Sequence, residues 1–249
     1  ERQMENHPEK YPEFESESYV EPERPGFEFR YLYEILIRPS QTFEKIIPAG
    51  HAWVWPFLLY SIILILSSIV ILSSYTDDPS QLPENFRSLN LNSETLKLAV
   101  IIFTTIFTPV VAIITFLVSA GIYMFFENLI MGGKAKFREV MNVVSFSFMV
   151  MVPRLIIQTL FVLVGGKAFD ISFSLNVLLS SDLQGTFIYN WLSNFELFQI
   201  WVIVVIITGL SVLYKHSKAK TAVWLIPLTL MWWTLHALVS SISMESLAQ

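Results

Sequence analysis

The stretch from Leu98 to Phe126, LAVIIFTTIFTPVVAIITFLVSAGIYMFF, contains no Asp, Glu, Lys or Arg. A helix needs about 20 apolar residues to cross the hydrocarbon core of a membrane, and buried helices of soluble proteins are rarely so long and so uniformly apolar. Residues 46–76, 197–214 and 221–243 also lack charges, and 140–164 contains only Arg154. The sequence therefore predicts an integral membrane protein.

The composition supports the same conclusion. Hydrophobic residues make up 53% of the chain and charged residues 15%, whereas about 25% of the residues of a soluble domain are charged. The period-two alternation of a membrane β-barrel is missing, and backbone polar groups in hydrocarbon need internal partners, so the spanning segments are expected to be helical. We predict an all-α fold whose five transmembrane helices lie at 53–75, 99–126, 140–164, 197–214 and 221–243.

Lysine and arginine predict how the chain is oriented. They are frequent before the first span and in the short segments 127–139 and 215–220, whereas 77–97 and 165–196 carry few of them. Positively charged loops stay in the cytoplasm. The N-terminus is therefore expected in the cytoplasm, with the C-terminus outside and 244–249 as a short outer tail.

The chain before the first span divides into two parts. Residues 1–28 hold nine Glu and have a net charge of −6, so we expect a disordered acidic cytoplasmic tail. In residues 29–52 the apolar and charged side chains fall on separate helical faces, which predicts short amphipathic helices in the membrane interface. Ser40, after Pro39, is predicted to cap the second of them. Residues 53–243 form the predicted transmembrane domain.

Three short motifs resemble those of the bacterial Yip1-domain family of five-span membrane proteins. Residues 35–46 are similar to its Pro-x-x-x-Phe-x-x-Ile segment, 132–140 to its Gly-Gly-Lys-x-x-Phe loop, and 194–201 to its acidic-x-Phe-x-x-Trp start of the fourth span. The resemblance covers roughly residues 32–243, and the Asp-Leu-Tyr-Gly-Pro motif of eukaryotic members is not found in the chain. Nine residues, eight of them from these stretches, are predicted to contact a partner or to form an ion pair: Pro39, Phe43, Lys134, Phe137, Arg138, Glu196, Phe198 and Trp201, together with Arg154.

Arg154 is the one charge inside a predicted span. A charged side chain at the centre of a bilayer costs about 2.5–3.5 kcal/mol on insertion scales. Glu196, at the outer start of the fourth span, is the first candidate for an ionic partner, and Asp170 is the second. Two interpretations stay open, namely a polar cavity or partner contact, and a structural bridge or snorkelling side chain.

Other conspicuous residues are expected to be structural. Gly132-Gly133 can end the second span in a left-handed turn, and Glu127 is interpreted as a residue of the span boundary. His236 is interpreted as a hydrogen-bonded core residue, and Phe198 and Trp201 as packing or interface anchors. No cofactor, nucleotide or metal site is predicted, because the chain has no Cys and lacks the Walker spacing.

The resemblance implies a non-enzymatic accessory protein that binds other membrane proteins and assists the assembly or activity of a membrane complex, such as an ABC-type exporter, in a bacterial cytoplasmic membrane. The alternative is a small transporter or channel with Arg154 in its path. Broken polar helices would support that alternative, and the sequence pattern indicates none. An intramembrane enzyme is the third hypothesis, since the His-Glu-x-x-His and Gly-x-Ser-x-Gly motifs are missing.

Overall fold

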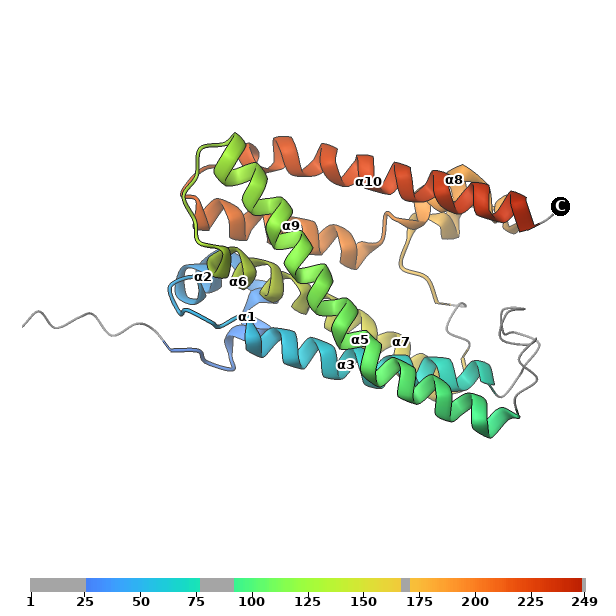
Figure 1. Cartoon of the computed structure of the whole chain (residues 1–249). Helices are drawn as coiled ribbons and strands as arrows, with labels where there is room; N and C mark the ends of the chain where they lie inside the picture. The colour runs from blue at the N-terminus through green and yellow to red at the C-terminus, as the bar shows by residue number, and fades with distance from the viewer. Residues whose placement is uncertain (1–25, 77–91, 167–170, 248–249) are drawn as a thin grey trace, which may run out of the picture.

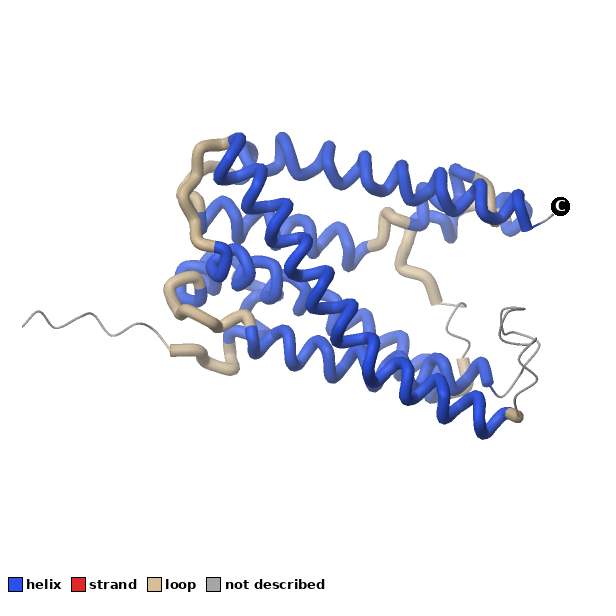
Figure 2. Tube along the Cα trace, in the orientation of Figure 1, coloured by secondary structure: helices blue, strands red, loops and turns tan. Residues whose placement is uncertain are grey.

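The computed structural model describes residues 26–76, 92–166 and 171–247. The predicted acidic tail therefore lies outside the described residues, except for its last three positions, and so does Asp170. The described chain is helical and has no strand, apart from an isolated bridge between Ser174 and Glu196. Figure 2 shows the helices and the loops between them. The helices are α1 (Tyr31–Ile37), α2 (Pro39–Ile46), α3 (Val54–Thr76), α5 (Ser93–Met124), η2 (Phe125–Ile130), α6 (Phe137–Ser147), η3 (Phe148–Val150), α7 (Met151–Leu163), η4 (Leu175–Leu178), η5 (Ser181–Leu183), α8 (Phe187–Ser193), α9 (Leu197–Leu213) and α10 (Lys218–Leu247).

Four helical stretches are long and apolar enough to cross a membrane, and α9 is a shorter apolar helix. The long stretches are Val54–Ser73, Glu94–Ile130, Phe137–Leu163 and Lys218–Ile242. They coincide with four of the five predicted spans, and α9 coincides with the other. The prediction of an all-α, multi-pass fold is therefore confirmed.

The helices pack as one bundle (Figure 1). α3 lies against α5 and α7, while α10 lies against α8 and α9, and α6 contacts both α5 and α9. Figure 1 shows α5 crossing the bundle diagonally, with the turns 131–136 and 214–217 at the same end as α1 and α2. We call this end the basic end, because these turns and their flanks carry Lys134, Lys215 and Lys218.

The two short amphipathic helices occur where the pattern predicts them, but their apolar faces enter the bundle. Ile35 of α1 and Phe43 and Ile46 of α2 are completely buried, and α2 packs along α9. The predicted cap is wrong: α2 begins at Pro39 without any side-chain cap. Proline suits this first helical position, since its fixed φ matches the helix and an N–H there would have no partner.

A buried asparagine holds the turn between α2 and α3. Asn142 of α6 donates from Nδ2 to the carbonyls of Ile46 and Gly50, at 3.1 and 3.2 Å, and accepts from the Trp53 N–H at 2.8 Å. The Ser145 hydroxyl adds a hydrogen bond of 2.7 Å to the Trp53 carbonyl. These bonds satisfy backbone groups that helix ends leave without partners, so the segment before the first span is fixed to α6.

A short helix precedes the fourth predicted span. α8 and α9 are separated by Asn194, Phe195 and Glu196, and both helices pack on α10. The Trp191 indole of α8 donates to the Thr234 hydroxyl at 3.1 Å, so α8 lies beside the apolar stretch of α10. The sequence pattern does not indicate α8, which has only seven residues. α9 itself is continuous over Leu197–Leu213 and matches the predicted span 197–214.

Candidate functional site

Arg154 and Glu196 form the predicted ion pair. The Nε atom of Arg154, in the first turn of α7, bonds the carboxylate of Glu196, which directly precedes α9. Both side chains are partly buried, with 30% and 18% of their surface exposed. The pair therefore joins α7 to the start of α9, and the residues that the sequence singled out as partners do meet.

A polar cavity lies beside this ion pair. It has a volume of about 290 Å³ and is bounded by the break between α8 and α9 and by α10. His236 lies on its wall, is exposed, and forms no hydrogen bond within the described part of the chain, so its interpretation as a hydrogen-bonded core residue is wrong. The side chains that line the cavity are Ser193, Asn194, Glu196, Gln199, Trp232, Trp233 and His236.

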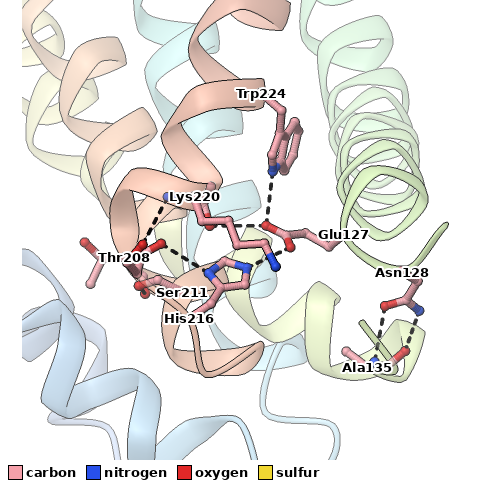
Figure 3. A network of polar contacts seen from close by, with 10 residues as sticks. Glu127, Asn128, Ala135, Thr208, Ser211, His216, Lys220 and Trp224 are labelled. Atoms are coloured by element: carbon pink, nitrogen blue, oxygen red, sulfur yellow. Dashed lines mark hydrogen bonds and ion pairs between the residues drawn. The ribbon is translucent and has the colours of Figure 1, made fainter. Parts of the chain in front are cut away.

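A second carboxylate is buried near the basic end. Glu127 has no exposed surface and accepts hydrogen bonds from the Thr221 hydroxyl and the Trp224 indole, each at 3.2 Å, while His216 Nε2 lies 2.8 Å from its other oxygen. Figure 3 shows Trp224, near the start of α10, and His216, in the turn before it, pointing towards Glu127. The residue ends the second span as predicted, but it is not a surface residue of the boundary.

Local structure turns Glu127 inward. The residue lies in η2, a π-helical turn that continues α5, and π-helical turns occur often at functional sites. Gly132 adopts the predicted left-handed conformation, with φ of 77°. A Cβ on Gly133 would lie 2.4 Å from the Tyr214 ring, so only glycine lets the loop pack against the end of α9. The Asn128 side chain pairs with both backbone groups of Ala135 (Figure 3).

The segment that leads into α1 is held by a charged contact. The Tyr31 hydroxyl donates to the Glu28 carboxylate at 2.8 Å. This hydrogen bond lowers the pKa of Glu28, and the positive charge of Arg30 lowers it further. The Arg30 guanidinium also reaches Glu28, at 2.7 Å. The amphipathic segment therefore begins with its charges paired at the surface.

The nine residues predicted as contacts fall into three groups. Arg154 and Glu196 meet at the cavity, whereas Lys134 and Phe137 are exposed at the basic end and Arg138 is half-buried there. The other four belong to the packing: Pro39 starts α2, and Phe43, Phe198 and Trp201 contribute to the core, with the Phe198 ring centroid 5.2 Å from that of Phe173.

Sequence reasoning missed the groups around Glu127. Thr221, Trp224 and His216 are distant in sequence, and only the topology brings them to the carboxylate. A Trp with a Thr three residues before it, at the start of a span, is the sole signal that the sequence offers. Within the described ranges no group of three His, Asp or Glu residues is arranged to hold a metal ion.

These observations define an all-α, multi-pass membrane protein with two internally paired carboxylates. The Yip1 domain matches residues 33–240 of the chain, and the protein therefore belongs to the Yip1 family. No curated protein and no solved structure matches the chain.

Proposed function

We propose that this Yip1-family protein is a non-enzymatic accessory subunit, which binds another integral membrane protein and assists the assembly or activity of that complex. It lies in a bacterial cytoplasmic membrane, with its N-terminus and its basic end in the cytoplasm. The partners to test first are the subunits or the adaptor of an ABC-type exporter. The resemblance of the sequence motifs to the bacterial family suggests these partners and this membrane.

The observation that carries the proposal is an aliphatic ridge on α5. Side chains four residues apart form a continuous row along this helix, and each exposes between 41% and 61% of its surface. Branched aliphatic side chains lose little rotamer freedom when they pack, and helices associate in membranes largely through van der Waals packing. Successive members of the row are turned by about 40° round the helix axis, so a second transmembrane helix that crosses α5 obliquely would pack against a few consecutive members. The members of the row are Leu98, Ile102, Ile106, Val110, Ile114, Val118 and Ile122.

Crosslinking in the native membrane, followed by purification in mild detergent, tests this proposal. A photoreactive residue at Ile106 should capture exporter subunits, and these subunits should be recovered in stoichiometric amount. The same residue at Val223, which is 72% exposed on α10, is the matched control and should capture far less. A monodisperse lone protein, or equal capture from both positions, would contradict the proposal.

The ion pair at the start of α9 favours a second candidate, a small transporter or channel. Ionisable residues inside a transmembrane bundle pair with one another and mark substrate or ion pathways. Here Glu196 is paired with Arg154 of α7. Solute flux through liposomes that contain the purified chain would support this candidate, provided that Arg154→Leu abolishes the flux. Liposomes that contain the protein and remain impermeable to solutes would exclude this candidate.

A further inference from the structure

The hydrogen bonds that already exist at the junction of α8 and α9 determine which polar groups of the cavity remain available to a ligand. The Ser193 hydroxyl donates to the Asn190 carbonyl at 2.6 Å. The Asn194 amide group donates to the carbonyls of Asn190 and Trp191, at 2.8 and 3.3 Å. The polar hydrogens of these two side chains are therefore committed to α8. What Ser193 and Asn194 still offer to a ligand is acceptor lone pairs.

The remaining polar groups of the cavity add further acceptors. Glu196 brings a carboxylate, which also accepts from Arg154. Gln199, in the first turn of α9, is partly exposed and makes no hydrogen bond within the part of the chain that the structure describes. Its amide oxygen is therefore available to a ligand that donates hydrogen bonds.

Two tryptophans complete the lining. Trp232 and Trp233 of α10 both border the cavity, and an indole ring attracts a cation that lies over its face. Arg154 already balances the charge of Glu196, so the free acceptor lone pairs and the aromatic rings, rather than a net negative charge, favour a cationic group that donates hydrogen bonds. A primary ammonium group has this chemistry, since it carries one positive charge and three N–H donors, whereas a quaternary ammonium group has the charge without the donors.

The position of the cavity indicates where such a group would come from. His236 lies 18 residues after Lys218, or about 27 Å along α10, and the hydrocarbon core is about 30 Å thick. With Lys218 at one surface of the membrane, the cavity lies near the headgroups of the opposite leaflet. Trp232 is 66% exposed, so the cavity is open towards the side of the bundle, where lipid lies.

We propose that the cavity at the break between α8 and α9 binds a primary ammonium group, supplied by a phospholipid with an ethanolamine headgroup in the leaflet opposite the basic end or by a soluble amine of the same chemistry. Glu196, Gln199, Ser193 and Asn194 accept its hydrogen bonds, and Trp232 and Trp233 flank the charge. The cavity volume of about 290 Å³ suits a headgroup of this size.

Native mass spectrometry of the full chain in detergent, with added lipid, measures this binding directly. We expect phosphatidylethanolamine to bind about tenfold more tightly than phosphatidylcholine, because the choline headgroup cannot donate the charge-assisted hydrogen bonds. Phosphatidylglycerol, which lacks an ammonium group, should bind no better than phosphatidylcholine. Equal binding of the three lipids, together with no effect of free ethanolamine, would overturn the proposal.

Substitutions test whether the preference for ethanolamine lipid over choline lipid depends on the cavity. Gln199→Leu removes an acceptor and Trp232→Ala removes an aromatic wall, and each should reduce the preference for ethanolamine lipid over choline lipid to less than about threefold. Trp55→Ala removes another exposed tryptophan, on α3, and should leave the preference unchanged. A preference that survives both cavity variants would place the ligand elsewhere and overturn the proposal.

Free ethanolamine separates the two sources. If millimolar ethanolamine raises the melting temperature of the lipid-free protein and choline does not, the site takes a soluble amine. If only phosphatidylethanolamine binds, the site takes the lipid. Either result supports an ammonium site. Gln199→Leu should weaken whichever binding is observed, that of ethanolamine or that of phosphatidylethanolamine. The melting temperature of this variant without ligand shows whether it is folded.

Discussion

Two glutamates in this molecule differ in how their charge is satisfied. Glu127 is completely buried and is met by His216, Thr221 and Trp224. Glu196 is partly exposed, is met by Arg154, and borders a cavity. The first carboxylate is enclosed by the structure, whereas the second is left beside open space.

The difference teaches which charge is available for a ligand. A buried carboxylate stays stable only if hydrogen bonds replace its lost hydration, and at Glu127 both oxygens have partners from the basic end. At Glu196 the neighbouring Gln199 has no partner in the described chain. We therefore propose that Glu127 stabilises the fold and that Glu196 takes part in binding a ligand. Substitutions at and around the two carboxylates test this difference.

The largest effect is expected for Glu127→Leu. The substitution leaves the His216, Thr221 and Trp224 groups buried without their acceptor, and breaking a buried pair in this way costs about 3–5 kcal/mol. Thermal unfolding in detergent, followed by tryptophan fluorescence, should show a clear fall in melting temperature. Glu44→Leu, at an exposed glutamate of α2, is the control. Equal melting temperatures of the two variants would refute a structural role for Glu127.

Arg154→Leu should have a smaller effect, because the ion pair is partly exposed. We expect a loss of about 1.5–3 kcal/mol, typical of hydrogen bonds to charged groups. The double variant Arg154→Leu/Glu196→Leu should recover part of this loss, since no charge is then left unpaired. The same thermal measurement checks both, and a double variant that is less stable than the single one would show that Glu196 has another essential partner.

Two helical glycines test how tightly the basic end is packed. A Cβ on Gly209 of α9 would lie 2.6 Å from Val143 and 2.7 Å from Phe43, whereas a Cβ on Gly121 of α5 would meet nothing within 4 Å. Gly209→Ala should therefore destabilise the protein by about 1–3 kcal/mol through overpacking. Gly121→Ala should stabilise it by about 0.5–1 kcal/mol. Chemical or thermal unfolding compares them, and effects of the same sign would contradict this packing.

The smallest effects should differ between the two carboxylates. Thr221→Val removes a hydrogen bond to Glu127 and should cost about 1 kcal/mol. Gln199→Leu removes a partly exposed amide that has no partner in the described chain and should change stability by no more than about 0.5 kcal/mol. Melting curves without added lipid measure both. Destabilisation by Gln199→Leu would mean that the amide supports the fold rather than a ligand.

Much of the architecture could be predicted, because long apolar stretches leave a membrane chain few alternatives. The ion pair could be predicted too, since Arg154 is the sole charge in its span and Glu196 begins the next one. Glu127 lies near the end of the second apolar stretch, as predicted, but its burial could not be predicted, because its partners follow about 90 residues later. α8 was missed because seven residues carry too short an apolar pattern to indicate a half-helix.

The hydrogen bonds of Asn142 have a consequence for how the protein is made. The amphipathic segment leaves the ribosome before the first span, but the side chain that fixes the α2–α3 turn belongs to the third membrane-crossing stretch. Docking of that turn must wait until α6 has been synthesised and inserted. Until then the apolar faces of α1 and α2 have no α6 or α9 to cover them, and the membrane surface or the insertion machinery must shelter them.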